Sequence, residues 1–207
     1  YQLLHASSNF DIRHNFQATL TEDLPGRFQS RPLNAALSKW SLDLRFTARS
    51  GLPVDILGGQ GIDPLTSTSL DFHANRVPGV PLYMQDASVP GGRQINYDAF
   101  TIASDTDGNP IEGNGGRNSA RGFDAVQLDL AVRKEFALTE RLRLQFRAEA
   151  FNLFNRANFG SIYNDLTVGP EFFGQASNTL NAQLGGLNPL YQTGGPRSLQ
   201  LALRLRF

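Results

Sequence analysis

The chain has 207 residues with 19 basic and 19 acidic side chains, so its formal net charge is zero. This balance gives no support to a nucleic-acid partner or a polybasic membrane-surface arm, because both depend on clustered positive charge. The sequence contains no cysteine, which excludes disulfides and thiolate metal sites within it. No run approaches the ~18 consecutive apolar residues of a spanning helix, so a membrane crossing would have to use strands.

Five segments alternate apolar and polar residues with the period of two that a strand imposes. In the first of them, residues 10–22, His14 interrupts the apolar face. The fourth, residues 142–150, is rich in helix-forming residues, but five successive even-numbered positions are apolar, which favours a strand over a helical stripe. We therefore expect strands at 10–22, 37–49, 124–137, 142–150 and 197–207.

The connections between these strands alternate in length. Residues 24–36 contain Pro25, Gly26 and Pro32 and predict a turn region, and the short segment 138–141 predicts a hairpin. Residues 51–122 and 155–196 are rich in Gly, Pro, Asn, Asp and Ser. Because structureless loops of this length are uncommon in compact domains, we expect two functional or disordered excursions there.

Strands of ten or more residues match tilted transmembrane β-strands, and alternating short turns and long loops are typical of outer-membrane barrels. We therefore expect an all-β fold, specifically a transmembrane antiparallel β-barrel segment of about five long amphipathic strands with two long extracellular loops. Five strands would leave the barrel incomplete, as a curved sheet with unpaired edges at its first and last strands. If Phe207 is periplasmic, the long excursions lie outside the cell.

Aromatic residues fall where the two membrane interfaces would be. An outer-membrane barrel carries aromatic girdles at both interfaces. Lys134, near the lower rim of the apolar face, would extend its amine to the headgroups. The expected girdle consists of Trp40, Phe136 and Phe207 at the periplasmic rim, and Phe10 and Phe154 at the opposite rim.

A soluble β-sandwich or a lipocalin-like barrel would show the same alternation, with the apolar face turned toward a core. The length of the strands and of the two excursions disfavours that alternative. The chain begins at Tyr1 without a signal peptide, which we interpret as a fragment or a processed piece.

Several segments carry a family resemblance, the most specific being RAEAFNLFNRANF at 147–159 and the terminal LQLALRLRF at 199–207. They resemble the C-terminal barrel region of TonB-dependent outer-membrane receptors, in particular the Oar-like branch with an N-terminal carboxypeptidase-regulatory-like domain. The resemblance implies a barrel of ~22 strands, of which residues 1–207 would be the single-domain C-terminal part. The plug, the N-terminal barrel strands and the segment that contacts TonB would lie outside this sequence.

The terminal strand of this sequence resembles the signal by which the barrel-assembly machinery recognises its client proteins. Carried over to this sequence, the signal consists of Leu201, Leu203, Leu205 and Phe207.

No catalytic pattern is present. The histidines lie far apart in sequence, and neither a nucleophile elbow nor a phosphate-binding glycine loop occurs, so we expect no enzyme activity and no cofactor. The run at 105–109 resembles a calcium loop but lacks ligands, and an Asp/Gly turn fits better. Pairs such as Asp43 with Arg45 and Arg147 with Glu149 are typical of ion-pair ladders along a lumen.

The excursions contain aromatic residues that could stack on a sugar or peptide ligand or pin the loops together: Tyr83, Tyr97, Phe100, Phe172, Phe173 and Tyr191. The resemblance implies a receptor that imports a scarce extracellular solute, with outer-membrane lipid around its wall. The alternatives are an anchor or adhesin barrel without transport, and a soluble β-sandwich binding protein, enzyme or lectin.

Overall fold

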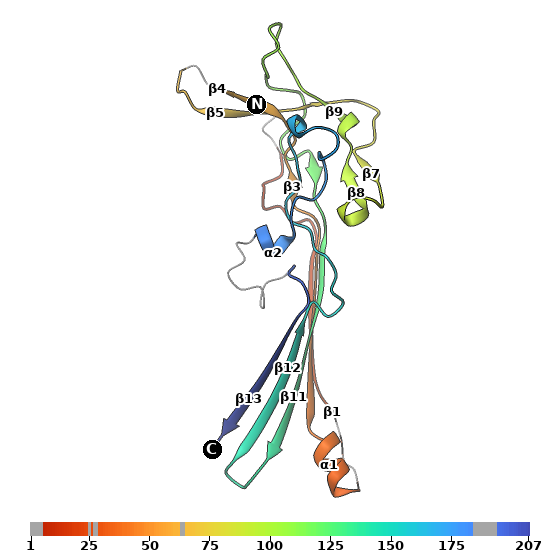
Figure 1. Cartoon of the computed structure of the whole chain (residues 1–207), viewed down its shortest axis with the longest axis vertical. Helices are drawn as coiled ribbons and strands as arrows, with labels where there is room; N and C mark the ends of the chain where they lie inside the picture. Colours follow the sequence, from red (N-terminus) through yellow and green to blue (C-terminus); the bar gives the residue numbers. More distant parts are fainter. Residues whose placement is uncertain (1–5, 25, 27–28, 63–64, 184–193) are drawn as a thin grey trace.

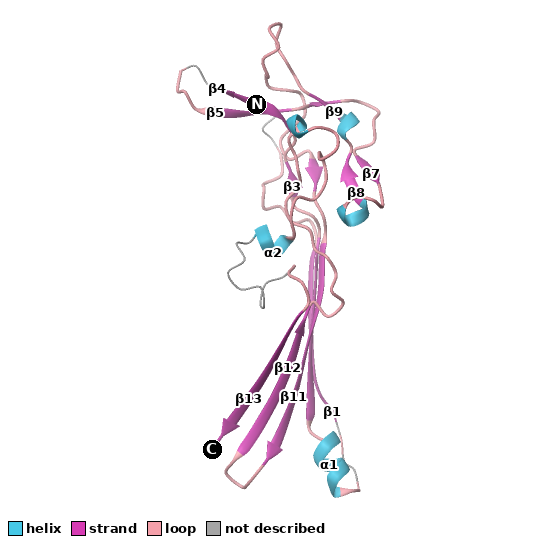
Figure 2. Ribbon diagram, viewed as in Figure 1, coloured by secondary structure: helices cyan, strands magenta, loops and turns pink. Residues whose placement is uncertain are grey.

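The computed structural model describes residues 6–24, 26, 29–62, 65–183 and 194–207. Long strands form one end of the molecule and a mass of loops forms the other (Figure 1). The helices are short and lie outside the long strands, as Figure 2 shows. Among the described residues, no helix combines the length and the apolar content that a bilayer crossing requires. The expected all-β class is confirmed.

The five amphipathic segments form one antiparallel sheet whose order follows the chain. The first and last strands occupy its two edges, so the sheet is open, as predicted. Its strands, in order, are β1 (Asn15–Leu24), β2 (Trp40–Arg49), β11 (Ala125–Ala137), β12 (Arg143–Phe151) and β13 (Ser198–Arg206).

One row of apolar residues crosses all five strands near the middle of the sheet. Leu20 stands opposite Leu44, and Leu44 stands opposite Leu130. Ala150 and Leu199 complete the row on β12 and β13. Directly opposite residues share a face, and a slip of one residue would turn a strand's apolar side chains to the other face. The register therefore confirms the alternation in the sequence.

The first strand begins later than the alternation predicted. Arg121, from the long excursion, binds both the carboxylate and the backbone carbonyl of Asp11, which draws the segment before Asn15 away from the sheet. The predicted start at residue 10 was therefore wrong. His14 lies just before the strand, where its carbonyl accepts the N–H of Ser50 at 2.9 Å, so it no longer interrupts the apolar face.

The connection between β1 and β2 contains a short helix that the sequence pattern did not predict. This helix, α1 (Arg31–Leu37), has Pro32 in its first turn, where a missing N–H leaves no hydrogen bond unmade. The carbonyl of Ser38, directly after α1, accepts a hydrogen bond from Nζ of Lys134 at 2.7 Å. The Lys134 side chain is buried, so the prediction that it reaches the headgroups was wrong: the chain supplies its own acceptor.

The predicted hairpin between β11 and β12 is confirmed. The N–H of Leu138 donates to the carbonyl of Leu142 at 2.9 Å, and the hydroxyl of Thr139 accepts the N–H of Leu142 at 3.0 Å. Because β12 is an extended strand, the choice of strand over helix for this segment was correct.

Over their described residues the two excursions are folded, which rules out the disordered alternative there. Residues 51–62, 65–124 and 152–183 fold into one body at the end of the sheet opposite α1, here called the loop body (Figure 1). It contains the strand pairs β3–β10, β4–β5, β6–β9 and β7–β8. Its elements are β3 (Pro53–Val54), β4 (Leu57–Ile62), β5 (Ser69–His73), β6 (Asn75–Arg76), β7 (Tyr83–Gln85), η2 (Pro90–Gly92), β8 (Arg93–Ile95), η3 (Tyr97–Ala99), β9 (Phe100–Thr101), β10 (Ala120–Arg121), η4 (Leu166–Val168) and α2 (Leu180–Gln183).

A buried apolar cluster in the loop body holds the two excursions together. Phe173 is completely buried, with its ring 5.6 Å from Tyr97 and 6.1 Å from Phe100 in edge-on contacts. These aromatic residues therefore pin the loops, whereas Phe172 is half exposed and Tyr191 lies outside the described residues. The buried members of the cluster are Ile56, Ala74, Ile95, Ala99, Phe100, Ala120, Ile162, Leu166 and Phe173.

The excursions also meet through their backbones. Gly174 has a φ of +79°, and its carbonyl accepts the N–H of Ile95 at 3.1 Å. A Cβ at Gly174 would lie 2.1 Å from the carbonyl oxygen of Ile95, so only glycine permits this approach.

Three asparagines spaced three residues apart join the loop body to the sheet. The side-chain amide of Asn152 donates to the carbonyl of Gly195 at 2.8 Å, and Oδ1 of Asn155 accepts the N–H of Arg197 at 3.0 Å. Asn158, which is also buried, accepts a backbone N–H at the start of β11. The FNLFNRANFG segment thus holds the returning chain where it enters β13.

We expect Asn152→Ala to destabilise this joint more than Asn155→Ala. Both asparagines have positive φ values, but Asn152 is buried and Asn155 is exposed. Leaving the buried carbonyl of Gly195 without its donor costs ~1–3 kcal/mol, whereas water can replace Asn155. Hydrogen exchange at the first residues of β13 measures the difference. Equal effects of the two substitutions would contradict this role of Asn152.

Candidate functional site

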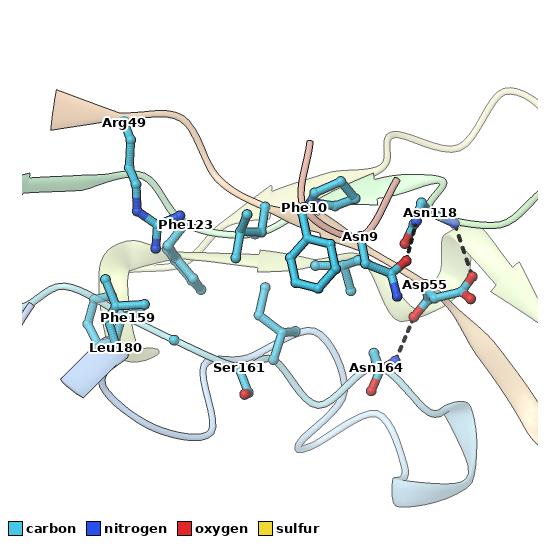
Figure 3. A pocket seen from close by; sticks show the side chains of 16 residues that line it. Asn9, Phe10, Arg49, Asp55, Asn118, Phe123, Phe159, Ser161, Asn164 and Leu180 are labelled. Carbon is cyan, nitrogen blue, oxygen red and sulfur yellow. Dashed lines mark hydrogen bonds between the residues drawn. The ribbon is translucent and has the colours of Figure 1, made fainter. Parts of the chain in front are cut away.

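The loop body borders a hollow of about 430 Å³ near the end of the sheet. Its walls come from the segment before β1, the end of β2 with the residues after it, the approach to β11, and residues 159–164. Figure 3 shows Asp55, Asn118 and Asn164 at one end, Phe123, Phe159 and Arg49 at the other, and Phe10 beside Asn9 between them. The side chains that argue for a binding site are Asn9, Phe10, Arg49, Asp55, Asn118, Phe123, Phe159, Ser161 and Asn164.

Asp55 organises the polar end of the hollow. Its carboxylate accepts the N–H of Asn118 at 3.1 Å, and its backbone carbonyl accepts the side-chain amide of Asn164 at 2.6 Å. Asn118 in turn donates to Oδ1 of Asn9 at 2.8 Å. Four segments far apart in the sequence are thus joined, and their amide and carboxylate groups line this wall (Figure 3).

The aromatic end is built around Phe123 and Phe159, whose ring centroids lie 5.0 Å apart. The guanidinium of Arg93 makes cation–π contacts beside this pair, 5.1 Å from the ring of Phe123 and 4.6 Å from that of Tyr83. The same guanidinium donates to the carbonyl of Gly122 at 2.8 Å. An apolar wall with a few placed polar groups is the usual composition of a small-molecule site.

His73 lies between two carboxylates elsewhere in the loop body. Its Nδ1 is 2.6 Å from Oε1 of Glu112, and its Nε2 is 3.1 Å from Oδ1 of Asp55. Burial opposes a charge on the ring, but the hydrogen bond to Glu112 and the charges of both carboxylates outweigh it and raise the pKa of His73. His73 therefore links three segments of the first excursion through Asp55 and Glu112, and Asp55 connects it to the hollow.

We expect the loop body to lose stability as the pH rises. The pKa of His73 is higher in the folded chain than in the unfolded one, so its contribution is complete below the unfolded value of about 6.5. That contribution disappears as the pH passes through the raised folded value. Hydrogen exchange of the amides near residues 56, 74 and 113, corrected for intrinsic rates, should therefore accelerate above neutral pH. His73→Gln should abolish the dependence; an unchanged pH profile in this variant would contradict the assignment.

The polar face of the sheet carries ion pairs. Arg147 lies 2.5 Å from Glu149, as the sequence predicted. Asp43 instead pairs across the sheet with Arg133 at 3.0 Å, and Arg45 does not provide its partner in the described ion pairs. The sequence pattern identified the face correctly, but only the register selects the partner on β11.

The Asp105 segment forms a turn, as predicted. The Asp105 carboxylate accepts the backbone N–H groups of Asp107 at 2.9 Å and of Asn109 at 2.8 Å. Hydrogen bonds from Asn109, first of all from its side chain, hold the pKa of Asp105 below its ordinary value. Within the described residues, no group of three or more His, Cys, Asp or Glu side chains is arranged to hold a metal ion.

The structure brings part of the expected aromatic girdle together. At the α1 end, the rings of Trp40 and Phe136 lie 5.1 and 5.2 Å from Nζ of Lys134. Phe207 follows β13 at the same end and is fully exposed. Phe154 and Phe10 lie exposed at the opposite end, but Phe10 precedes β1 and borders the hollow rather than forming part of a strand. Their role as a girdle stays a prediction.

The residues expected to form the assembly signal lie on the free edge of the sheet. Leu201, Leu203 and Leu205 project from β13 with 72%, 71% and 53% of their surfaces exposed, and Phe207 follows them. Recognition by the assembly machinery stays a prediction, and the exposure of this row fits an apolar environment.

Sequence patterns missed the groups that assemble the loop body. His73 and its two acidic partners are separated by 18 and 39 residues, and Arg121 is 110 residues from Asp11. No local period relates such positions. The regular spacing of Asn152, Asn155 and Asn158 was the one signal that could have been read from the sequence.

Comparison with known proteins agrees with this architecture. A family model described as an outer membrane beta barrel domain matches residues 2–200. Searches of curated proteins and of solved structures gave no match. The open antiparallel sheet, its exposed apolar face and the family match lead to one conclusion: the chain belongs to the outer membrane beta-barrel family and is located in the outer membrane.

Proposed function

We propose that this chain is the C-terminal barrel wall of a TonB-dependent receptor that binds and imports a scarce solute with energy coupled from the inner membrane. The observation that carries the proposal is the loop body: both excursions pack together at one end of the membrane sheet and border a hollow with polar and aromatic walls. Loops held on a rigid scaffold and a hollow with apolar and polar walls are typical of ligand-binding sites. In this arrangement the loop body is extracellular and the α1 end is periplasmic.

Each surface of the chain then has a partner. The apolar sheet face contacts outer-membrane lipid, and β13 presents Leu201, Leu203, Leu205 and Phe207 to the barrel-assembly machinery. The polar face, with pairs such as Asp43 and Arg133, faces the lumen and a plug supplied by another part of the protein. TonB would act through that other part. The chain has a binding role and no catalytic one, and its ligand is a small solute, a sugar or a peptide.

Solute uptake tests the proposal directly. Cells with and without the gene are given a defined mixture of oligosaccharides and peptides, and depletion of each compound from the medium is measured with and without a protonophore. We expect at least one compound to be depleted only when both the gene and the proton gradient are present. Gene-independent depletion of every compound would argue for an anchor or adhesin barrel, and so would a gene that encodes no plug domain.

A substitution that fills the hollow should block the same uptake. Ser161 lines the hollow, and tryptophan at this position would occupy much of its volume. Ala87 is exposed elsewhere on the loop body, so Ala87→Trp is a matched control for the added ring. We expect Ser161→Trp to reduce uptake and Ala87→Trp to leave it unchanged. Equal uptake by both variants, at equal surface abundance, would exclude this hollow as the ligand site.

A further inference from the structure

At the end of the sheet that carries α1, the chain directly after the helix is hydrogen-bonded to the apolar face of the sheet. In the register, Trp40 stands between Leu24 on β1 and Lys134 on β11, so all three side chains lie on the apolar face. Nζ of Lys134 reaches the carbonyl of Ser38, which directly follows α1. The end of the helix is therefore tied to the apolar side of the sheet and not to its polar side.

The ammonium of Lys134 is held by contacts within the chain. Besides the carbonyl of Ser38, it lies 5.1 Å from the ring of Trp40 and 5.2 Å from that of Phe136. These contacts shield the charge, and its side chain is 2% exposed. Cation–π contacts gain strength away from water, which suits a site at a membrane interface. Lys134 thus fastens α1 to the rim.

The helix fastened in this way exposes leucines instead of burying them. Leu33 and Leu37, four residues apart on one helical face, are 51% and 50% exposed. The apolar face of the sheet is likewise exposed at Leu24, which is 47% exposed at the end of β1. Exposure of this apolar surface to water would be unfavourable. The apolar face of the sheet contacts lipid, and Lys134 on that face is hydrogen-bonded to Ser38 at the end of α1. We therefore expect the exposed leucines of α1 to contact lipid as well.

We propose that α1 is a membrane-interface foot: it lies in the plane of the bilayer surface, with Leu33 and Leu37 inserted among the acyl chains and Lys134 anchoring it. Its partner is the lipid leaflet that already covers the apolar face of the sheet. Short amphipathic helices insert their apolar face at the boundary between headgroups and acyl chains, and Trp and Lys are typical flanking residues there.

Site-directed spin labelling tests the foot. The full-length protein is reconstituted in vesicles of phospholipid and lipopolysaccharide, with single labels at Leu33→Cys and Leu37→Cys; residues 1–207 contain no cysteine of their own. Labels at Leu201→Cys, on the exposed apolar face, and Glu140→Cys, in the exposed turn at the same end, mark lipid and water. Collision rates with oxygen, which partitions into lipid, and with a water-soluble nickel chelate are compared.

We expect the oxygen-to-nickel ratio at positions 33 and 37 to exceed that at 140 severalfold and to approach that at 201. Ratios at both positions equal to that at 140, with position 201 in lipid, would overturn the foot and leave the receptor proposal untouched. A label at 201 that reports water would remove the lipid face and the foot together.

The anchoring role of Lys134 has its own readout. Lys134→Met keeps a long apolar side chain but loses the donor to Ser38, so a label at position 37 should become more mobile while one at 140 keeps its spectrum. An unchanged spectrum at position 37 would overturn the anchor.

Discussion

Arginine at Leu201 should destabilise the membrane-embedded protein by ~2–4 kcal/mol, the cost of a basic side chain on the lipid face near the middle of a barrel strand. Leu201 lies near the centre of β13, is 72% exposed and stands opposite Ala148, so no acidic partner is available in the register. Reversible denaturant unfolding in lipid vesicles measures the loss. The substitution therefore tests whether the side chain of Leu201 faces lipid or is covered by another part of the protein.

The matched control is arginine at the adjacent position. Gln200 lies on the opposite face of β13 and stands directly across from Glu149. A positive charge at this position meets water and an acidic partner, so Gln200→Arg should change the free energy of unfolding by less than about 1 kcal/mol. If both arginines destabilised the protein equally, the assignment of the two sheet faces would be wrong.

Replacing Phe173 with alanine should separate the two excursions within the loop body. Phe173 is completely buried against Tyr97 and Phe100, and removal of a buried aromatic ring costs ~3–5 kcal/mol. The ring is contributed by the second excursion and its two partners by the first. Its loss therefore separates the two excursions. Hydrogen exchange should show faster opening of amides in both, including those of β8 and η3.

Phe172 provides the control, because it is adjacent in sequence but 53% exposed. Its ring contacts only Tyr163 among the described aromatic pairs, at 6.2 Å. Phe172→Ala should therefore leave exchange in the first excursion unchanged. In both variants the amides at the centre of β11 and β12 should keep their protection, since the loop-body core does not extend into the sheet. Loss of protection throughout the sheet in Phe173→Ala would mean that the two parts unfold as one unit.

The long strands were predictable because their information is local. Alternation over 37–49 and 124–137 sets both the strand and its apolar face, and the short connection at 138–141 leaves only a hairpin. The structure reproduces these elements within a few residues. The exception is the start of β1, where Asp11 continues the alternation but is held by Arg121 in the loop body.

The candidate site could not be predicted in the same way. Its walls join Asn9, Asp55, Asn118 and Asn164, which belong to four segments without a common period. Composition identified these segments as loops. In loops rich in Gly, Asn and Pro, the sequence pattern does not predict which of the few apolar residues will contact one another. The buried pairing of Phe100 with Phe173, 73 positions apart, depends on the sheet bringing both loops to the same end.

The alternation of the sequence by itself determined long strands with one apolar and one polar face, because a strand turns successive side chains to opposite sides wherever it lies. Only the tertiary structure decided that the excursions form a packed body, that His73 lies between Asp55 and Glu112, and that Lys134 fastens α1 to the rim. The physical reason is the range of the interactions. Periodicity acts between neighbours along a strand, whereas these contacts join residues that only the completed sheet brings within hydrogen-bonding distance.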